Sequence, residues 1–375
     1  MRSLTVSVFC LAALTAGMSA ADQAENPAAI LAPYFRPPAA LEKAGEFRSP
    51  LLFDDGTRVQ SAKDWPRRRE EILKYWHGVM GAWPPLLEKP AFETIREEPG
   101  GSLTQRRVKL EVAPEQKQEG WLLLPEGKGP FPAVLVVYYE PETSVGLNAD
   151  DKHAFRDYGL QLAQRGFVTL SIGSPGGNAW KPETGKAACQ PLSFHAYVAA
   201  NAWTALAALP QVDAKRIGVV GHSYGGKWAL FAAALWEKFA AVAVSDPGVV
   251  WDESRPNVNY WEPWYLGQDA ALKAQRREGV PSDKNPRTGP YARLVADKRD
   301  LTDLHALICP RPFLVSGGSE DPAERWKALN HARGVNALLG ADNRVAMTNR
   351  PNHTPDEKAN AVVWAFFTHF LKPNP

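Results

Sequence analysis

The stretch "RIGVVGHSYGGKWAL", residues 216–230, runs from a short apolar segment through a serine between glycines into residues that favour a helix. Its centre, from Gly221 to Gly225, has the pattern G-x-S-x-G. A strand that turns at once into a helix strains the residue at the turn, and a side chain two positions away on either side would collide with neighbouring backbone. The pattern therefore predicts that Ser223 is raised above the end of a buried strand, where a nucleophile can meet a substrate.

The sequence around this stretch alternates between strand-like and helix-like segments. Buried strands are indicated by "FPAVLVVYY", "FVTLSIG", "RIGVVG", "AAVAVSDPG", "RPFLVSGGSED" and "NRVAMTN", with amphipathic or alanine-rich segments between them. Such alternation predicts an α/β fold with a mostly parallel central sheet and helices on both faces. Ligands bind such sheets at the carboxyl ends of the strands, so the site is expected there.

The chain divides into three parts by composition, and the third contains a segment of distinct composition. Residues 1–21 have the charge and apolar pattern of a cleaved signal peptide, which predicts a periplasmic or secreted protein without stable membrane association. Residues 22–100 are expected to form an N-terminal extension packed on the core, with a helix at 64–83. Residues 101–375 are expected to form the α/β domain that carries Ser223, in which the tryptophan-rich segment at about 249–306 is expected to form a lid.

Composition excludes several partners. The 43 basic and 41 acidic residues give a net charge of +2 without long blocks of one sign, which argues against nucleic acid. No metal-binding motif occurs, and neither a metal nor a cofactor is expected. After signal cleavage two cysteines remain, Cys189 and Cys309, and their spacing leaves open whether they pair.

A serine nucleophile needs a base, and the base needs a carboxylate. His353 follows the last predicted strand and is the expected base, since in this fold the order along the chain is serine, acid, histidine. Asp321, at the end of the preceding strand, is the favoured acid. Asp246, which ends the strand after the elbow helix, is its main rival, and Glu320 is a third candidate.

Acyl transfer also needs two donors for the oxyanion. The backbone N–H of Tyr224, at the start of the elbow helix, is the first candidate. The second is expected from the turn after "VLVVYY", near Tyr139 or Glu140.

Residues 101–375 resemble an α/β-hydrolase, and "GHSYGGK" resembles the elbow G-C-S-R-N-G-K of the glucuronoyl esterases. Ser223, Gly226 and Lys227 stand in matching places. The resemblance implies a serine hydrolase of uronic acid esters in plant cell walls, whose lysine helps to hold the sugar. Tyr224 and Gly225 replace the arginine and asparagine of that family, and the arginine is one of its oxyanion donors. More broadly, the chain is similar to acetyl-xylan-esterase-like and dienelactone-hydrolase-like proteins.

The leading hypothesis is a secreted serine esterase acting on a carbohydrate ester, such as a uronate or acetyl ester on a plant or algal polysaccharide. Aromatic rings that would suit sugar faces, or equally a lid core, are Trp251, Trp261 and Trp264. Lys227 and Arg255 are candidates for holding a carboxylate, or are ordinary surface cations. The alternatives are a prolyl-oligopeptidase-type serine peptidase and a non-catalytic sugar-binding protein that retains the fold.

Overall fold

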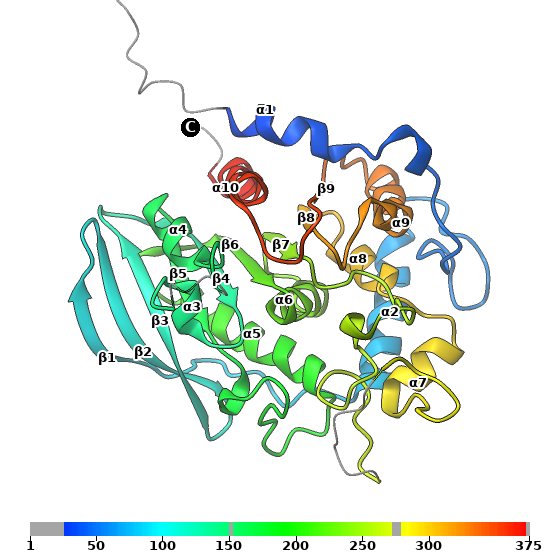
Figure 1. The fold of residues 1–375 in the computed structure, drawn as a ribbon, viewed down its shortest axis with the longest axis horizontal. Helices are drawn as coiled ribbons and strands as arrows, with labels where there is room; N and C mark the ends of the chain where they lie inside the picture. Colours follow the sequence, from blue (N-terminus) through cyan, green and yellow to red (C-terminus); the bar gives the residue numbers. More distant parts are fainter. Residues whose placement is uncertain (1–25, 149, 151–152, 272–278, 373–375) are drawn as a thin grey trace, which may run out of the picture.

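The computed structural model describes residues 26–148, 150, 153–271 and 279–372, and a nine-stranded sheet runs through its centre (Figure 1). The strand order is β1-β2-β3-β5-β4-β6-β7-β8-β9. The strands from β5 to β9 in this order pair in parallel, and β1, β2 and β3 pair antiparallel at one side. The strands are β1 (Phe92–Pro99), β2 (Leu103–Ala113), β3 (Gln116–Pro125), β4 (Phe131–Val137), β5 (Val168–Ile172), β6 (Val212–His222), β7 (Ala241–Ser245), β8 (Phe313–Gly317) and β9 (Val345–Asn349).

Helices cover both faces of the sheet because its central strands are buried on both sides. On β4, Ala133, Leu135 and Val137 face one core, whereas Val134 and Val136 face the other. The helices are α1 (Pro27–Leu31), α2 (Trp65–Met80), α3 (Pro141–Ser144), α4 (Tyr158–Gln164), α5 (Pro191–Ala207), α6 (Tyr224–Leu235), α7 (Gly289–Ala296), α8 (Thr302–Ile308), α9 (Trp326–Leu338) and α10 (Glu357–Leu371). α5, α6, α8 and α9 share the first core, and α4, α10 and α1 contribute to the second.

The predicted alternation and the α/β fold class are confirmed, with one difference at the N-terminal boundary. The strands were expected to begin after Gly101, but β1 lies earlier and pairs with β2 as the edge of the sheet. Its sequence, "FETIREEP", is charged, and Ile95 is half exposed, so it lacks the apolar alternation that marks a half-buried strand. The sheet therefore includes part of the segment that was assigned to the extension.

The described part of the extension packs on the hydrolase body. α2 presents Ile72, Trp76 and Met80 to the core, the face expected from their spacing of four residues. Arg68 lies on the same buried face, where its guanidinium pairs with Asp54 and Glu71. α1 packs against α10 on the other side of the molecule (Figure 1). Residues 1–21, the predicted signal peptide, lie outside the described residues.

The segment at 249–306 connects β7 to the crossover helix α8. Its described residues contain the 3₁₀ turn Pro256–Val258, α7 and the first part of α8, and no strand. Part of this segment lines the cavity described below. Cys189 and Cys309 are both buried free thiols, so they do not pair. Within the described ranges, no helix is both long and apolar enough to cross a membrane.

Trp76 joins α2 to the core and provides a test of the extension's role. Its ring is fully buried and packs edge-on against Phe231 of α6, and its Nε1 donates to Asp303 of α8 at 3.1 Å. Trp76→Ala leaves a large cavity, so we expect the free energy of unfolding to fall by about 3–5 kcal/mol in chemical denaturation. The control Leu86→Ala, at a partly exposed site, should cost about 0.5 kcal/mol or less. Equal costs for the two variants would mean that α2 does not stabilise the core.

Candidate active site

The turn from β6 into α6 has the predicted strained geometry. Ser223 lies between the two elements with φ 56° and ψ −116°, a conformation that L-residues rarely adopt. A Cβ at Gly221 would collide with the backbone of Gly225, and a Cβ at Gly225 would collide with the carbonyl of Val137. The Ser223 N–H donates to the Ser245 carbonyl at 2.8 Å, which ties the turn to β7. Both glycines are therefore required by close backbone approach.

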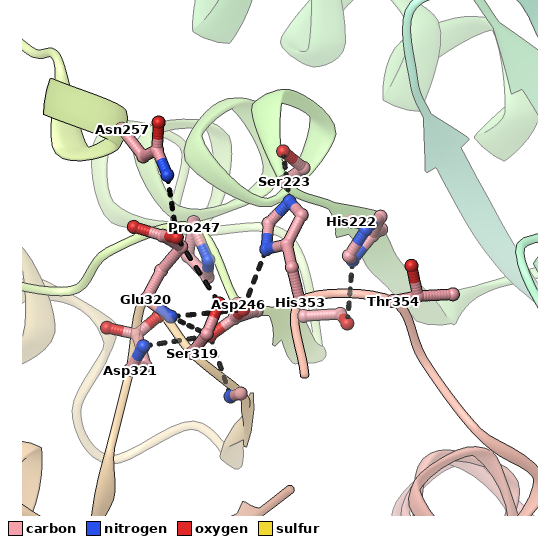
Figure 2. A network of polar contacts seen from close by, with 12 residues as sticks. His222, Ser223, Asp246, Pro247, Asn257, Ser319, Glu320, Asp321, His353 and Thr354 are labelled. Carbon is pink, nitrogen blue, oxygen red and sulfur yellow. Dashed lines mark hydrogen bonds and ion pairs between the residues drawn. The ribbon is translucent and has the colours of Figure 1, made fainter. Parts of the chain in front are cut away.

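His353 links Ser223 to a carboxylate. Its Nε2 lies 2.8 Å from the Ser223 Oγ, and its Nδ1 lies 2.7 Å from Asp246 Oδ2 (Figure 2). The carboxylate is fully buried, whereas the imidazole keeps 36% of its side chain exposed. A carboxylate on Nδ1 sets the tautomer and leaves Nε2 free to accept the serine proton. The structure thus brings together the predicted serine and histidine.

The expectation that Asp321 contacts this histidine is wrong, because Asp246 occupies that place. Asp246 has φ 51°, which turns its carboxylate across the end of the sheet. Its Oδ1 accepts from the backbone N–H groups of Gly318 at 2.6 Å and Asp321 at 2.8 Å. Its Oδ2 accepts from the imidazole and, at 3.2 Å, from the backbone N–H of Glu320. The Asp321 carboxylate faces the opposite way and accepts from the N–H groups of Gly248 and Val249 at 2.8 and 2.6 Å.

Glu320, the third candidate acid, has a different set of contacts. Its Oε1 accepts from the Arg255 guanidinium at 3.2 Å and lies 3.4 Å from the Asn257 amide. Its side chain is buried in the cavity wall beside Asp246 (Figure 2). It has no hydrogen bond to His353 among the described contacts, so the structure does not place it in the role of the acid.

Arg350, which sequence reasoning missed, holds the loop that carries His353. Its buried guanidinium donates to the His353 carbonyl at 2.7 Å and to the Thr354 carbonyl at 2.9 Å. The same group donates to the Ser316 carbonyl at 2.8 Å and to the Ser245 hydroxyl at 3.2 Å. One cation thus joins the ends of β7 and β8 to the histidine loop. Its place three residues before His353 was the only signal in the sequence.

The site opens into a cavity of about 660 Å³, within the usual range for small-molecule sites. Its wall is formed by side chains from the elbow, the strand ends and the segment after β7. The lining residues are Tyr139, Trp180, Ser223, Tyr224, Lys227, Asp246, Pro256, Asn257, Asn259, Glu262, Tyr265, Gly279, Ser319, Glu320 and His353.

The two candidates for the second oxyanion donor differ in position. Tyr139 lines the cavity, and its hydroxyl interacts with the Ser223 side chain. Burial raises the pKa of Tyr139 more than this contact lowers it, so the phenol keeps its proton at neutral pH. Glu140 caps the short helix α3 and accepts from the Thr143 hydroxyl, away from the cavity lining. The structure therefore favours Tyr139 over Glu140 at the cavity wall.

Tyr224 begins α6, and its side chain points into a buried polar network. Its hydroxyl accepts from the Ser174 hydroxyl at 3.0 Å and donates to Nε2 of His195. Burial lowers the pKa of His195 to about 4, and its Nδ1 donates to the Pro191 carbonyl, so the neutral ring accepts through Nε2. The backbone N–H of Tyr224 lies at the positive end of a 12-residue helix.

The two predicted substrate cations behave differently. Lys227 lines the cavity, donates to the Pro247 carbonyl and lies 4.9 Å from the ring centroid of Tyr260. Burial lowers the pKa of Lys227 to about 8, although three neighbouring carboxylates oppose this shift. Arg255 is outside the lining and is engaged by Glu320 and the Ser319 carbonyl. The structure thus leaves Lys227, and not Arg255, in the cavity wall.

Of the two roles left open for Trp251, Trp261 and Trp264, a sugar-binding surface or a packed core, the structure shows packing. Trp251 donates through Nε1 to the Arg299 carbonyl at 2.7 Å and packs on Tyr260. Trp261 and Trp264 are buried, and none of the three is in the cavity lining. The tryptophan that does line the cavity is Trp180, from the loop between β5 and α5. Sequence reasoning missed it because one tryptophan in a glycine-rich loop carries no pattern.

Comparisons with known proteins agree with this geometry. Residues 87–252, which include the elbow, match the family described as Esterase FrsA-like. Among curated proteins, none matches the sequence. Similar solved structures include a glucuronoyl esterase from Solibacter usitatus (TM-score 0.64, 19% identity, 87% of this chain and 97% of that chain). A second is a glucuronoyl esterase from Teredinibacter turnerae (TM-score 0.62, 21% identity, 86% of this chain and 88% of that chain). A third is a putative acetyl xylan esterase from Bacteroides fragilis (TM-score 0.55, 15% identity, 80% of this chain and 79% of that chain).

The chain has the α/β-hydrolase fold. Identities this low establish the fold and leave the substrate open. The prediction of a carboxylic ester hydrolase is confirmed by the match to an esterase family over the segment that carries Ser223. Within the described residues, no group of three or more histidine, cysteine or acidic side chains is arranged to hold a metal ion.

The buried pair of carboxylates predicts a pH-dependent stability. Burial, together with the charge of Asp246, raises the pKa of Asp321 from 3.8 to about 6. The folded state therefore holds this proton more tightly than the unfolded chain, so the resulting stability is complete below pH 3.8 and is lost as the pH rises through 6. Asp321→Asn lacks this proton, and we expect the stability of the wild type relative to this variant to be greater at pH 4 than at pH 7, by on the order of 2 kcal/mol.

Chemical denaturation at the two pH values measures this difference. Asp283→Asn, at an exposed carboxyl group, is the control and should show little change between them. A difference between wild type and Asp321→Asn that is the same at pH 4 and pH 7 would show that the folded protein does not hold the Asp321 proton.

Proposed function

We propose that this protein is a serine esterase that hydrolyses a carbohydrate ester, with Ser223 as nucleophile, His353 as base and Asp246 as the acid. The hydrogen-bonded chain from Ser223 through His353 to Asp246 at the wall of the cavity is the observation that carries the proposal. An exposed serine alone is a weak nucleophile, whereas this chain provides a base at 2.8 Å and a buried carboxylate to orient that base.

In the proposed reaction, the Ser223 Oγ attacks the ester carbonyl while its proton passes to His353 Nε2. The carbonyl oxygen gains a negative charge, and we propose that the backbone N–H of Tyr224 and the phenol O–H of Tyr139 stabilise it. The bond to the alcohol oxygen then breaks, and His353 gives its proton to the leaving alcohol. Water attacks the acyl-enzyme with His353 again as base, which releases the acid and restores Ser223.

The carbohydrate part of the proposal rests on the cavity and on the similar structures. The lining offers amides, carboxylates and one lysine, which suit the hydroxyl groups of a sugar. Its carboxylates, Asp246, Glu262 and Glu320, outnumber its one ammonium group, Lys227, so a neutral ester fits better than a free uronate. Structures with the same fold are described as glucuronoyl and acetyl xylan esterases. A uronate ester or an acetyl ester is therefore the proposed substrate class.

The apolar segment within residues 1–21 supports an extracytoplasmic site of action, where plant or algal polysaccharide would be met. The two alternatives have less support. A prolyl-oligopeptidase-type enzyme has a repeat-built propeller, whereas residues 26–91 form helices and turns here. A non-catalytic sugar-binding protein would not need a strained serine hydrogen-bonded to a histidine.

The roles of the two carboxylates can be separated by kinetics on p-nitrophenyl acetate. Ser223→Ala and His353→Ala should abolish hydrolysis without unfolding, and Asp246→Asn should lower kcat by roughly 10³–10⁴, because the imidazole loses its orienting charge. Asp321→Asn is the matched control, with a smaller loss of roughly tenfold to a hundredfold through the loop it holds. A crippling Asp321→Asn beside a mild Asp246→Asn would contradict the assignment.

The substrate class is tested with a panel of acetylated xylan, benzyl glucuronate and a proline dipeptide anilide. We expect hydrolysis of one of the two carbohydrate esters, and covalent labelling of Ser223 by a fluorophosphonate that Ser223→Ala abolishes. Cleavage of the anilide alone would favour the peptidase. A folded protein that never reacts with the fluorophosphonate would favour the non-catalytic alternative.

A further inference from the structure

The loop between β5 and α5 places an exposed tryptophan at the cavity. Trp180 keeps 47% of its surface exposed and lines the same cavity as Ser223. Four other large hydrophobic residues are comparably exposed in the part of the chain that the structure describes: Leu86, Ile95, Leu147 and Phe155. None of these four is in the cavity lining. Among these five residues, Trp180 alone lies in the cavity that holds Ser223, where a bound ligand would remove its ring from water.

The ring of Trp180 is held in place before any ligand arrives. It packs edge-on against the buried ring of Trp264, with centroids 5.3 Å apart and planes at 87°. The backbone of its loop is fixed as well, because the Asn178 side chain accepts from the N–H groups of Trp180 at 3.0 Å and Lys181 at 3.1 Å. An edge-on contact supports the ring without covering both of its faces, and a fixed ring loses little entropy on binding.

Polar groups from another segment line the same cavity. Asn257 and Asn259, from the segment after β7, contribute side chains to its wall together with Glu320. Amide and carboxylate groups bind the hydroxyl groups at the edge of a pyranose ring, while an indole face packs on its C–H groups. The cavity volume of about 660 Å³ is larger than the reacting ester group requires.

We propose that Trp180 is a stacking platform for a sugar ring adjacent to the esterified unit, so that the preferred substrate is an ester carried on an oligosaccharide chain and not a small free ester. This inference rests on the proposed function and adds a subsite to it. Trp264, which was expected to bind sugar itself, supports Trp180 from behind. The site thus has a reaction centre at Ser223 and a separate recognition surface at Trp180.

The first test compares Trp180→Ala with wild type on two substrates, p-nitrophenyl acetate and an acetylated xylo-oligosaccharide. We expect kcat/KM for the oligosaccharide to fall by roughly 3- to 10-fold, mainly through KM, because one stacking contact is lost. For p-nitrophenyl acetate the change should be less than about twofold, since that substrate needs no flanking subsite. Trp180→Phe should recover part of the loss, and Phe155→Ala, exposed outside the lining, is the control.

The second test needs no catalysis, so it separates failure of the subsite from failure of the esterase. Binding of xylohexaose by the Ser223→Ala protein is compared by calorimetry with binding by the Ser223→Ala/Trp180→Ala protein. We expect affinity to fall by a similar 3- to 10-fold in the double variant. Equal binding by both, no binding by either, or equal losses of kcat/KM on the two ester substrates would overturn the proposal. If the wild type does not hydrolyse p-nitrophenyl acetate at all, this result would count against the proposed esterase activity and not against the sugar-binding subsite.

Discussion

The arrangement of the site depends on two buried carboxylates that fix each other's loops. Asp246 accepts backbone hydrogen bonds from the loop after β8, and Asp321 in that loop accepts backbone hydrogen bonds from the loop after β7. The exchange joins the ends of two parallel strands, beside the backbone hydrogen bond from the Asp246 N–H to the Ser316 carbonyl at 3.1 Å. Oδ1 of Asp246 accepts the shorter of these backbone hydrogen bonds, and Oδ2 faces His353. Arg350 makes a third connection, and this one uses a cation: its guanidinium holds the histidine loop at the same strand ends.

The sequence was sufficient for the elbow and insufficient for the acid, for a physical reason. Gly221 and Gly225 are required by close approach within a short stretch of chain, so the pattern itself carries the constraint. Asp246 and Asp321 both follow a buried strand, and these strands are neighbours in the sheet, so spacing treats them alike. What separates them is the positive φ of Asp246 and the direction of its carboxylate, which depend on tertiary contacts. Arg350 was missed because most of its partners are backbone carbonyl groups, and because the ends of β7 and β8 reach it only through the tertiary fold.

The aromatic segment after β7 shows a second limit of composition. Its tryptophans and tyrosines are numerous enough to build a local core, and Trp251 packs on both Tyr260 and Tyr291 there. A tryptophan in that core and a tryptophan that faces a ligand cannot be distinguished by residue type, and only their burial in the structure distinguishes them. The edge strand β1 was missed for a related reason, since a charged, exposed strand has no periodic apolar face. The prediction of strands and helices was reliable where one buried face imposes a regular spacing of apolar residues.

Tyr224 stands where the glucuronoyl esterase pattern has an arginine, and this difference changes which groups are available to stabilise the oxyanion. An arginine at the elbow would bring a charged donor toward the oxyanion, whereas the Tyr224 hydroxyl is directed away into contacts with Ser174 and His195. The proposed reaction therefore relies on neutral donors to stabilise the negative charge. These are the N–H at the start of α6, where the helix dipole adds a favourable potential, and the protonated phenol of Tyr139 beside Ser223. Neutral donors act without the cost of burying a cation, and this suits a cavity whose other charges are mostly negative.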